Sequence, residues 1–173
     1  MKKVSKLTGI IKAYGDNVNT DVIHNPSKFT ISREKLTVDL GLAGPPENRR
    51  VIIIAGENFG IGSSRYSTVL ALKNSGVVAV GAKSLSRIFK RNLACAGIFA
   101  FEFVPGSGGE IAKISGARTA EIEFDANVAA SHCAAIIREC GKKTGAVCVM
   151  DRYLFEIAGS GGMVKYLEES EER

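Results

Sequence analysis

The sequence predicts a single α/β domain spanning residues 1–173, with a mixed, partly parallel sheet flanked by helices. Two apolar, β-branched runs, VIIIA (51–55) and VVAVGA (77–82), are typical of strands buried on both faces. A helical pattern follows each run, and this alternation indicates parallel strands joined by crossover helices. The length of 173 residues suits one domain, and no internal repeat or linker divides it.

The alternation can be followed element by element. We expect a helix over 67–76, where Ser67 can cap the start and Gly76 the end. A second helix is expected over 84–97, because its apolar residues form one stripe before a terminating glycine. The run IFAFEF (98–103) then predicts a third strand of the parallel group.

The two flanking parts of the chain have different patterns. LTGIIKAYG (7–15) predicts a first strand, followed by a turn-rich segment and a long connection that has room for a short helix. Toward the C-terminus, EIAKI (110–114) and TAEIEF (119–124) alternate like an antiparallel hairpin. The remaining expected elements are a helix over AASHCAAIIREC (129–140), a strand over GAVCVM (145–150), and short helices over YLFEIAG (153–159) and MVKYLEE (163–169).

Composition favours a globular protein, and a site for small anionic substrates explains its modest positive charge as well as other interpretations do. The chain is 45% hydrophobic and 24% charged, which gives ample apolar material for a core. Its net charge of +5 comes from dispersed basic residues, and aromatic residues make up only 7%, so binding to nucleic acid is disfavoured. The opening segment lacks the apolar run of a signal peptide, and no stretch reaches the length of a membrane span. We therefore expect a soluble, cytoplasmic protein without a membrane partner.

The four cysteines do not form a metal-binding or disulfide pattern. Cys95, Cys133, Cys140 and Cys148 include no CxxC pair, and each lies in an apolar setting. They are expected to be small buried thiols, so no metal site is predicted in this chain. His132 adjoins Cys133 in the sequence, but on the predicted helix the two side chains would point in different directions.

The most informative segment is the glycine-rich GENFGIGSSRY (56–66), which lies between a predicted strand and a predicted helix. One interpretation is a tight turn whose glycines only satisfy the backbone geometry. The glycine order matches neither a dinucleotide-binding fingerprint nor a Walker loop. A further interpretation is a carboxylate or phosphate site, in which backbone N–H groups at a helix start and the guanidinium of Arg65 hold the anion.

Two serines lie directly before Arg65 in the sequence. A serine hydroxyl is a feeble base in water, but cationic groups and N–H donors can stabilise its alkoxide. The spacing therefore permits a site that abstracts a proton from a carboxylic acid.

The quoted segments resemble one known family. ENFGIGSSR and ALKNSGVVAVGAKSLSRIFKRNLACAGI strongly resemble the signature of the swivelling domain of the aconitase superfamily and its continuation. GDNVNTDVI resembles the opening loop of that domain, and GSGGMVKYLEE is similar to the C-terminal end of the small subunits of isopropylmalate dehydratases. The resemblance covers most of the chain in the right order. It implies a swivelling-type β/β/α domain that forms the separate small subunit of a two-subunit hydro-lyase.

The resemblance also implies a role for each matching residue. Ser63 matches the catalytic base, and Ser64 and Arg65 match residues that bind a substrate carboxylate. Thr20 and Asp21 match a threonine–aspartate pair at the edge of the same site. The loop that reads the variable group of the substrate corresponds to Lys28, Phe29, Thr30 and Ile31.

A partner and a cofactor are implied as well. The large subunit of such enzymes carries a four-iron, four-sulfur cluster, which acts as a Lewis acid on the leaving hydroxyl, and this chain would bind no cluster itself. The substrate would be a hydroxy-dicarboxylate, and dehydration of 3-isopropylmalate in leucine biosynthesis is the leading expectation. The alternatives are the small subunit of a methylmalate, dimethylmalate or homoaconitate-type dehydratase, and a non-catalytic module that binds an anion or RNA.

Two features depart from the family pattern. Tyr66 and Ser67 stand where relatives usually have glutamate and histidine. The loop from Lys28 to Ile31 has no arginine, which homoaconitase-type enzymes tend to use for a third carboxylate. An alkyl-substituted malate is therefore the expected substrate, because an unpaired buried carboxylate is costly.

Overall fold

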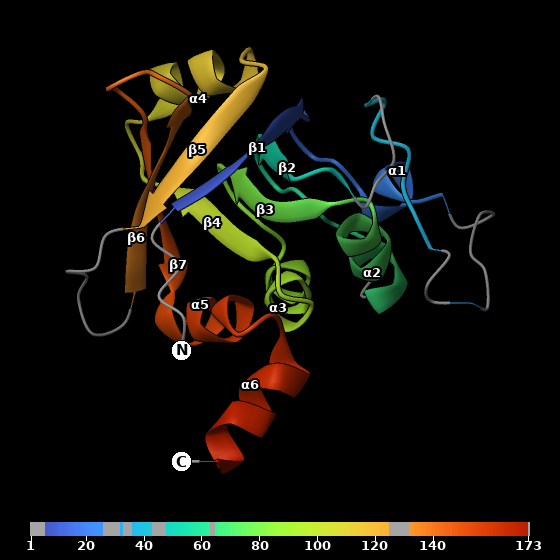
Figure 1. Ribbon diagram of the computed structural model, residues 1–173. Coiled ribbons are helices and arrows are strands. Elements are labelled where there is room, and N and C mark those ends of the chain that lie inside the picture. Colours follow the sequence, from blue (N-terminus) through green and yellow to red (C-terminus); the bar gives the residue numbers. More distant parts are fainter. Residues whose placement is uncertain are drawn as a thin grey trace.

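The computed structural model describes residues 6–25, 32, 36–42, 48–62, 65–124 and 132–172. Its strands are β1 (Lys6–Ala13), β2 (Val51–Ala55), β3 (Val77–Ala82), β4 (Phe99–Phe103), β5 (Thr119–Phe124), β6 (His132–Glu139) and β7 (Ala146–Asp151). Its helices are α1 (Thr20–Ile23), α2 (Tyr66–Asn74), α3 (Arg87–Cys95), α4 (Gly108–Ser115), α5 (Arg152–Gly159) and α6 (Met163–Glu171). The strands close into a barrel in the order β1-β2-β3-β4-β7-β6-β5 (Figure 1).

Neighbouring strands β1, β2, β3 and β4 form the parallel part of the barrel. Every residue of β2 is buried, as are all residues of β3 except Val78. The helices α2 and α3 connect β2 to β3 and β3 to β4. The parallel arrangement of these strands confirms the prediction made from the two apolar, β-branched runs.

Antiparallel pairing completes the barrel. β5 pairs with β1, β6 pairs with β5, and β7 pairs with both β6 and β4. The sheet is therefore mixed, as the sequence predicts. Its closure into a barrel goes beyond that prediction, which specified a mixed sheet only.

One half of the predicted hairpin is wrong. Residues 110–114 belong to helix α4 and not to a strand, whereas 119–124 is strand β5 as expected. The apolar residues Ile111 and Ile114 are both buried, and their spacing of three places them on one helical face. Alternation over five residues was too short to separate a strand from a single helical face.

The predicted helix over 129–140 is also wrong. Among its described residues, His132–Glu139 form strand β6, which pairs along one edge with β5 and along the other with β7. Alanine-rich sequence favours a helix locally, but pairing along both edges overrides that preference. His132 and Cys133 therefore alternate along a strand and do not share a helix.

The helix ends agree with the sequence only in part. α2 begins at Tyr66 with Arg65 as its N-cap residue, so Ser67 does not cap it. Gly76 and Gly97 follow α2 and α3 with φ of +86° and +85°, which confirms both as terminating glycines. The short helices expected near the C-terminus are α5 and α6, and α1 occupies the start of the long connection.

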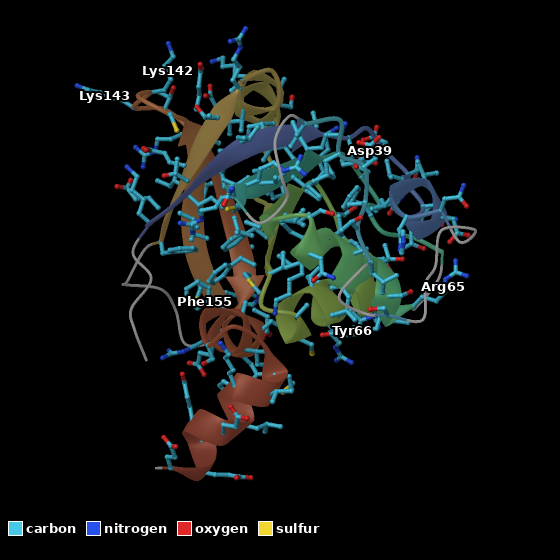
Figure 2. All side chains as sticks on the ribbon, turned by 45° about the vertical axis from the view of Figure 1, so that its right-hand side comes forward. Asp39, Arg65, Tyr66, Lys142, Lys143 and Phe155 are labelled. Carbon is cyan, nitrogen blue, oxygen red and sulfur yellow. The ribbon has the colours of Figure 1, made fainter. Side chains whose placement is uncertain are left out.

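An aromatic cluster ties α5 to the barrel. The ring of Phe99 lies 5.1 Å from that of Phe124 and 5.3 Å from that of Phe155, centroid to centroid. Phe155, labelled in Figure 2, thus joins α5 to strands β4 and β5. Among the described residues, no helix combines the length and apolar character needed to cross a membrane.

Candidate active site

Loops that follow three of the parallel strands meet at one end of the barrel. The β1 loop (residues 14–19) follows β1, the glycine loop (56–62) follows β2, and the β3 loop (83–86) follows β3. Because these strands are parallel, their carboxyl ends lie at the same edge of the sheet. This edge is where ligands bind in α/β proteins.

The β1 loop and the glycine loop are hydrogen-bonded along their length. The backbone bonds run from the N–H of Asn17 to the carbonyl oxygen of Glu57 (2.7 Å), from Gly60 to Val18 (2.9 Å) and from Thr20 to Ile61 (2.9 Å). Side chains add to them, since Asp16 accepts from the N–H of Glu57 at 2.8 Å and Asn58 donates to Asn17 at 2.9 Å. The two loops therefore form one unit that sets the position of α1.

Glycine is required in this loop because other segments approach it closely. Gly62 has φ of +105°, and a Cβ there would lie 2.5 Å from Oδ1 of Asn19. Gly60 has φ of +79°, and a Cβ there would lie 2.1 Å from the ring of Phe89. Both positions therefore exclude a side chain by conformation and by space.

The buried side chain of Phe59 fixes the glycine loop to the core. Its side chain is fully buried, with ring centroids 5.4 Å from Tyr14 and 5.8 Å from Phe89. Its backbone N–H donates to the carbonyl of Ser84 at 3.1 Å, and its carbonyl accepts from Ser86 at 3.0 Å. An aromatic side chain thus holds a loop of small residues against the β3 loop.

The predicted residues Asp21 and Arg65 lie together, next to these loops. Asn19 caps α1, because its side chain accepts a hydrogen bond from the N–H of Asp21 at 2.9 Å. Arg65 precedes α2, and its guanidinium forms an ion pair with the carboxylate of Asp21. The two side chains are 40% and 48% exposed, so an incoming anion can reach the guanidinium. Figure 2 shows Arg65 at the surface, on the side of the molecule that carries α1.

Thr20 supports this pair from inside and is fully buried. Its hydroxyl donates to Oδ1 of Asn19 at 3.3 Å, on the buried side of α1. The structure thus brings Thr20, Asp21 and Arg65 into one region. The other predicted site residues lie outside the described residues: Ser63, Ser64, Lys28, Phe29, Thr30 and Ile31.

Sequence reasoning missed the roles of Asn19 and Phe59. Asn19 could have been found, because asparagine directly before a short polar–acidic pair is a common helix cap. Phe59 gave no such signal, since its ring partners come from segments distant in the sequence. Tyr66 is the first residue of α2 and is 39% exposed, close to the ion pair in the chain.

The cysteines of this chain do not fit an iron–sulfur cluster. Within the described residues, no group of three or more histidine, cysteine, aspartate or glutamate side chains is placed to hold a metal ion. Cluster ligands are thiolates. Burial raises the pKa of the Cys148 thiol well above its usual range, and burial also raises the pKa values of Cys95 and Cys133. These three thiols therefore favour the protonated form.

Fold and site together define the class of this protein. The chain forms an α/β barrel domain with an arginine–aspartate pair at the carboxyl ends of parallel strands. The chain belongs to the aconitase C-terminal domain family, whose profile matches residues 4–106. This membership confirms the resemblance inferred from the glycine loop.

Similarity to individual proteins extends over most of the chain or over half of it. The chain is 32% identical to a 3-isopropylmalate dehydratase small subunit from Syntrophus aciditrophicus, over 94% of this chain and 96% of that protein. It is 42% identical over 93 residues to a methanogen homoaconitase small subunit from Methanothermobacter thermautotrophicus, which covers 50% of this chain and 54% of that protein. A crystal structure of a 3-isopropylmalate dehydratase from Methanocaldococcus jannaschii superposes with a TM-score of 0.70 at 28% identity, over 96% and 95% of the two chains.

Proposed function

We propose that this chain is the small subunit of a two-subunit hydro-lyase that acts on 3-isopropylmalate, and that residues 1–173 form one swivelling-type domain. The observation that carries the proposal is the match to a 3-isopropylmalate dehydratase small subunit over nearly the full length of both chains. The ion pair of Asp21 and Arg65 supports it, because a cation at the carboxyl edge of the sheet suits a dicarboxylate ligand.

The residues of this chain would bind the substrate and move one proton. Arg65 holds a substrate carboxylate through its planar guanidinium, at the N-terminus of a helix that also favours negative charge. Asp21 holds that guanidinium in place when no substrate is bound. Ser63 is the base that takes a proton from the substrate carbon, and Ser64 shares the carboxylate with Arg65. Both assignments rest on the family motif.

The large subunit is the proposed partner and the proposed carrier of the four-iron, four-sulfur cluster. The names of the relatives as small subunits support a larger partner. The poor fit of the cysteines described above supports a cluster outside this chain.

Ser63→Ala tests the assignment of the base. In the assembled enzyme, turnover of 3-isopropylmalate should fall by several orders of magnitude, because the proton acceptor is lost. Assembly with the large subunit, measured by co-purification, should be retained. A variant that keeps about one tenth of the activity, which corresponds to a rise of roughly 1.4 kcal/mol in activation free energy, would exclude Ser63 as the base.

The isolated chain provides the complementary test of the whole proposal. Purified without the large subunit, it should dehydrate no hydroxy acid, since the described residues hold no metal site. Mixed with the large subunit, it should restore dehydration of 3-isopropylmalate. Turnover by the isolated chain, or no gain on mixing, contradicts the proposal.

A homoaconitase-type small subunit is the second candidate, because a protein of that name is 42% identical over half of the chain. The two differ in the group that the loop from Lys28 to Ile31 contacts. Phe29 and Ile31 would favour an alkyl group, by about 0.8 kcal/mol for each buried methylene. The assembled enzyme should therefore have a higher kcat/KM for 3-isopropylmalate than for homocitrate or citrate. Thr30→Arg should shift this preference toward the tricarboxylates, and a wild-type preference for them would favour the second candidate.

A further inference from the structure

A cavity of about 520 Å³ lies between α3, α5 and the start of α6. Its α3 side carries Arg87 and Arg91, and its other side carries Tyr153, Ile157 and Met163. None of these residues belongs to the proposed substrate site. The volume is large enough for a bulky apolar side chain, and the wall offers apolar contact, the positive charges of α3 and one carboxylate, Asp151.

The two arginines are the charged part of this surface. Arg87 and Arg91 are exposed and lie one helical turn apart on α3. Neither forms an ion pair with any carboxylate in the part of the chain that the structure describes. A third cation at the cavity, Lys90, pairs with Glu102 at 2.6 Å. Like charges four residues apart on a helix repel, so a carboxylate between the two guanidiniums would be stabilising.

The three helices that border the cavity also carry exposed apolar side chains. Ile88 on α3 is 54% exposed, Tyr153 on α5 is 53% exposed, and Val164 and Leu167 on α6 are 71% and 50% exposed. Helix α6 buries none of its own residues, and Figure 1 shows it extending away from the barrel. Apolar exposure spread over three adjoining helices is typical of a surface that binds another protein.

We propose that this helical face, formed by Arg87, Ile88, Arg91, Tyr153, Val164 and Leu167, docks the large subunit. The partner segment that fits it carries carboxylates beside an apolar side chain. Its apolar group enters the cavity, and its carboxylates pair with Arg87 and Arg91. Arginine and tyrosine are among the residues most enriched at the centres of such interfaces. The inference rests on the proposed function, because that proposal supplies the partner.

Charge reversal tests the docking face. The purified chain is titrated with the purified large subunit at physiological salt, and the Kd of assembly is measured by calorimetry. Arg87→Glu combined with Arg91→Glu should raise the Kd by about tenfold or more, because two attractive contacts become repulsive. Val164→Ser combined with Leu167→Ser tests the apolar part and should raise the Kd by about fivefold or more. Circular dichroism checks that each variant is folded.

The matched control is Lys142→Glu combined with Lys143→Glu, which changes the net charge by the same amount. These lysines lie between β6 and β7, at the opposite end of the molecule from α6 (Figure 2). Their reversal should leave the Kd within about twofold, since screening limits charge effects to about 8 Å at this salt concentration.

The outcomes separate this inference from the proposed function. A charge-reversed α3 variant that is folded and binds as tightly as the control overturns the docking face alone. A wild-type chain that does not bind the large subunit overturns the proposed function, and the inference with it. If the isolated chain self-associates and the α3 variant abolishes that association, a second copy occupies the face and the inference is wrong.

Discussion

Arg65 is the residue on which substrate binding should depend most directly. Arg65→Lys keeps the charge but removes the planar pair of N–H donors. We expect kcat/KM of the assembled enzyme to fall by about a hundredfold, mainly through KM, because a bidentate contact is lost. The free energy of unfolding should change by less than about 1 kcal/mol, since the ion pair with Asp21 is largely exposed. An unchanged KM in steady-state kinetics would show that Arg65 does not hold the substrate.

Cys148 gives a pH-dependent prediction. Its thiol is fully buried and donates to the carbonyl of Ala135 at 3.3 Å, and burial raises its pKa above the ordinary value of 9.0. The unfolded chain therefore loses this proton first as the pH rises, so the thiol's stabilising contribution is complete below 9.0 and declines above it. The loss of stability caused by Cys148→Ala should thus be smaller at about pH 10.5 than at about pH 7.5, by up to about 1.4 kcal/mol per pH unit. Urea unfolding measures this difference, and an equal loss at both values contradicts the prediction.

At the scale of single residues, the sequence predicts which residues form the site better than it predicts their contacts. The glycine loop indicates that Arg65 binds an anion, and family resemblance adds Asp21. The capping of α1 by Asn19 is a local contact whose sequence signal was overlooked. The packing of Phe59 remained hidden, because it depends on segments that only the folded chain brings together.

Among the elements, the glycine loop is the one most sensitive to added volume. Gly62→Ala should lower the free energy of unfolding by about 1–3 kcal/mol, because a Cβ at this positive φ meets Asn19. It should also lower kcat/KM, since Asn19 caps the helix that carries Asp21. Gly15→Ala is the control, because a Cβ there meets no heavy atom within 4 Å. Thermal unfolding and kinetics compare the two variants, and equal effects would contradict the steric argument.

Elements with strong apolar runs were predicted well, and those with small residues were not. β2 and β3 are buried throughout or nearly so, and their β-branched residues identify them without tertiary information. β6 contains three small residues and a weak pattern, and it becomes a strand because β5 and β7 pair with it on both edges. α4 was mistaken for a strand because five residues sample too little of either period.

For the whole molecule, the seam between β4 and β7 should be the weakest part of the barrel. These strands pair at two positions, Glu102 with Val149 and Phe103 with Cys148, whereas β6 and β7 pair at six. Amide hydrogen exchange followed by NMR should therefore be slowest in β2 and β3 and faster for the amides that bridge β4 and β7. Protection at this seam equal to that of β2 would contradict the expectation.

Barrel closure is the feature of the whole molecule that the sequence did not reveal. It depends on β1 pairing with β5, with Leu7 opposite Ile122, across more than a hundred residues of sequence. The residue pattern of each strand fits an open mixed sheet as well as it fits a closed barrel. Only the joint register of all the strands decides whether the edges meet, and no short segment contains that information.

The bonded β1 and glycine loops also have a consequence for evolution and for engineering. Asp16 and Asn17 in one loop form hydrogen bonds to Glu57 and Asn58 in the other. The sequence of one loop therefore cannot change independently of the other. Substitutions accepted in one should be matched by substitutions in the other across the family. A chimaera that receives only one of these loops from a relative would inherit mismatched partners. A chimaera should therefore keep the stability of its parents only when both loops are transplanted as a pair.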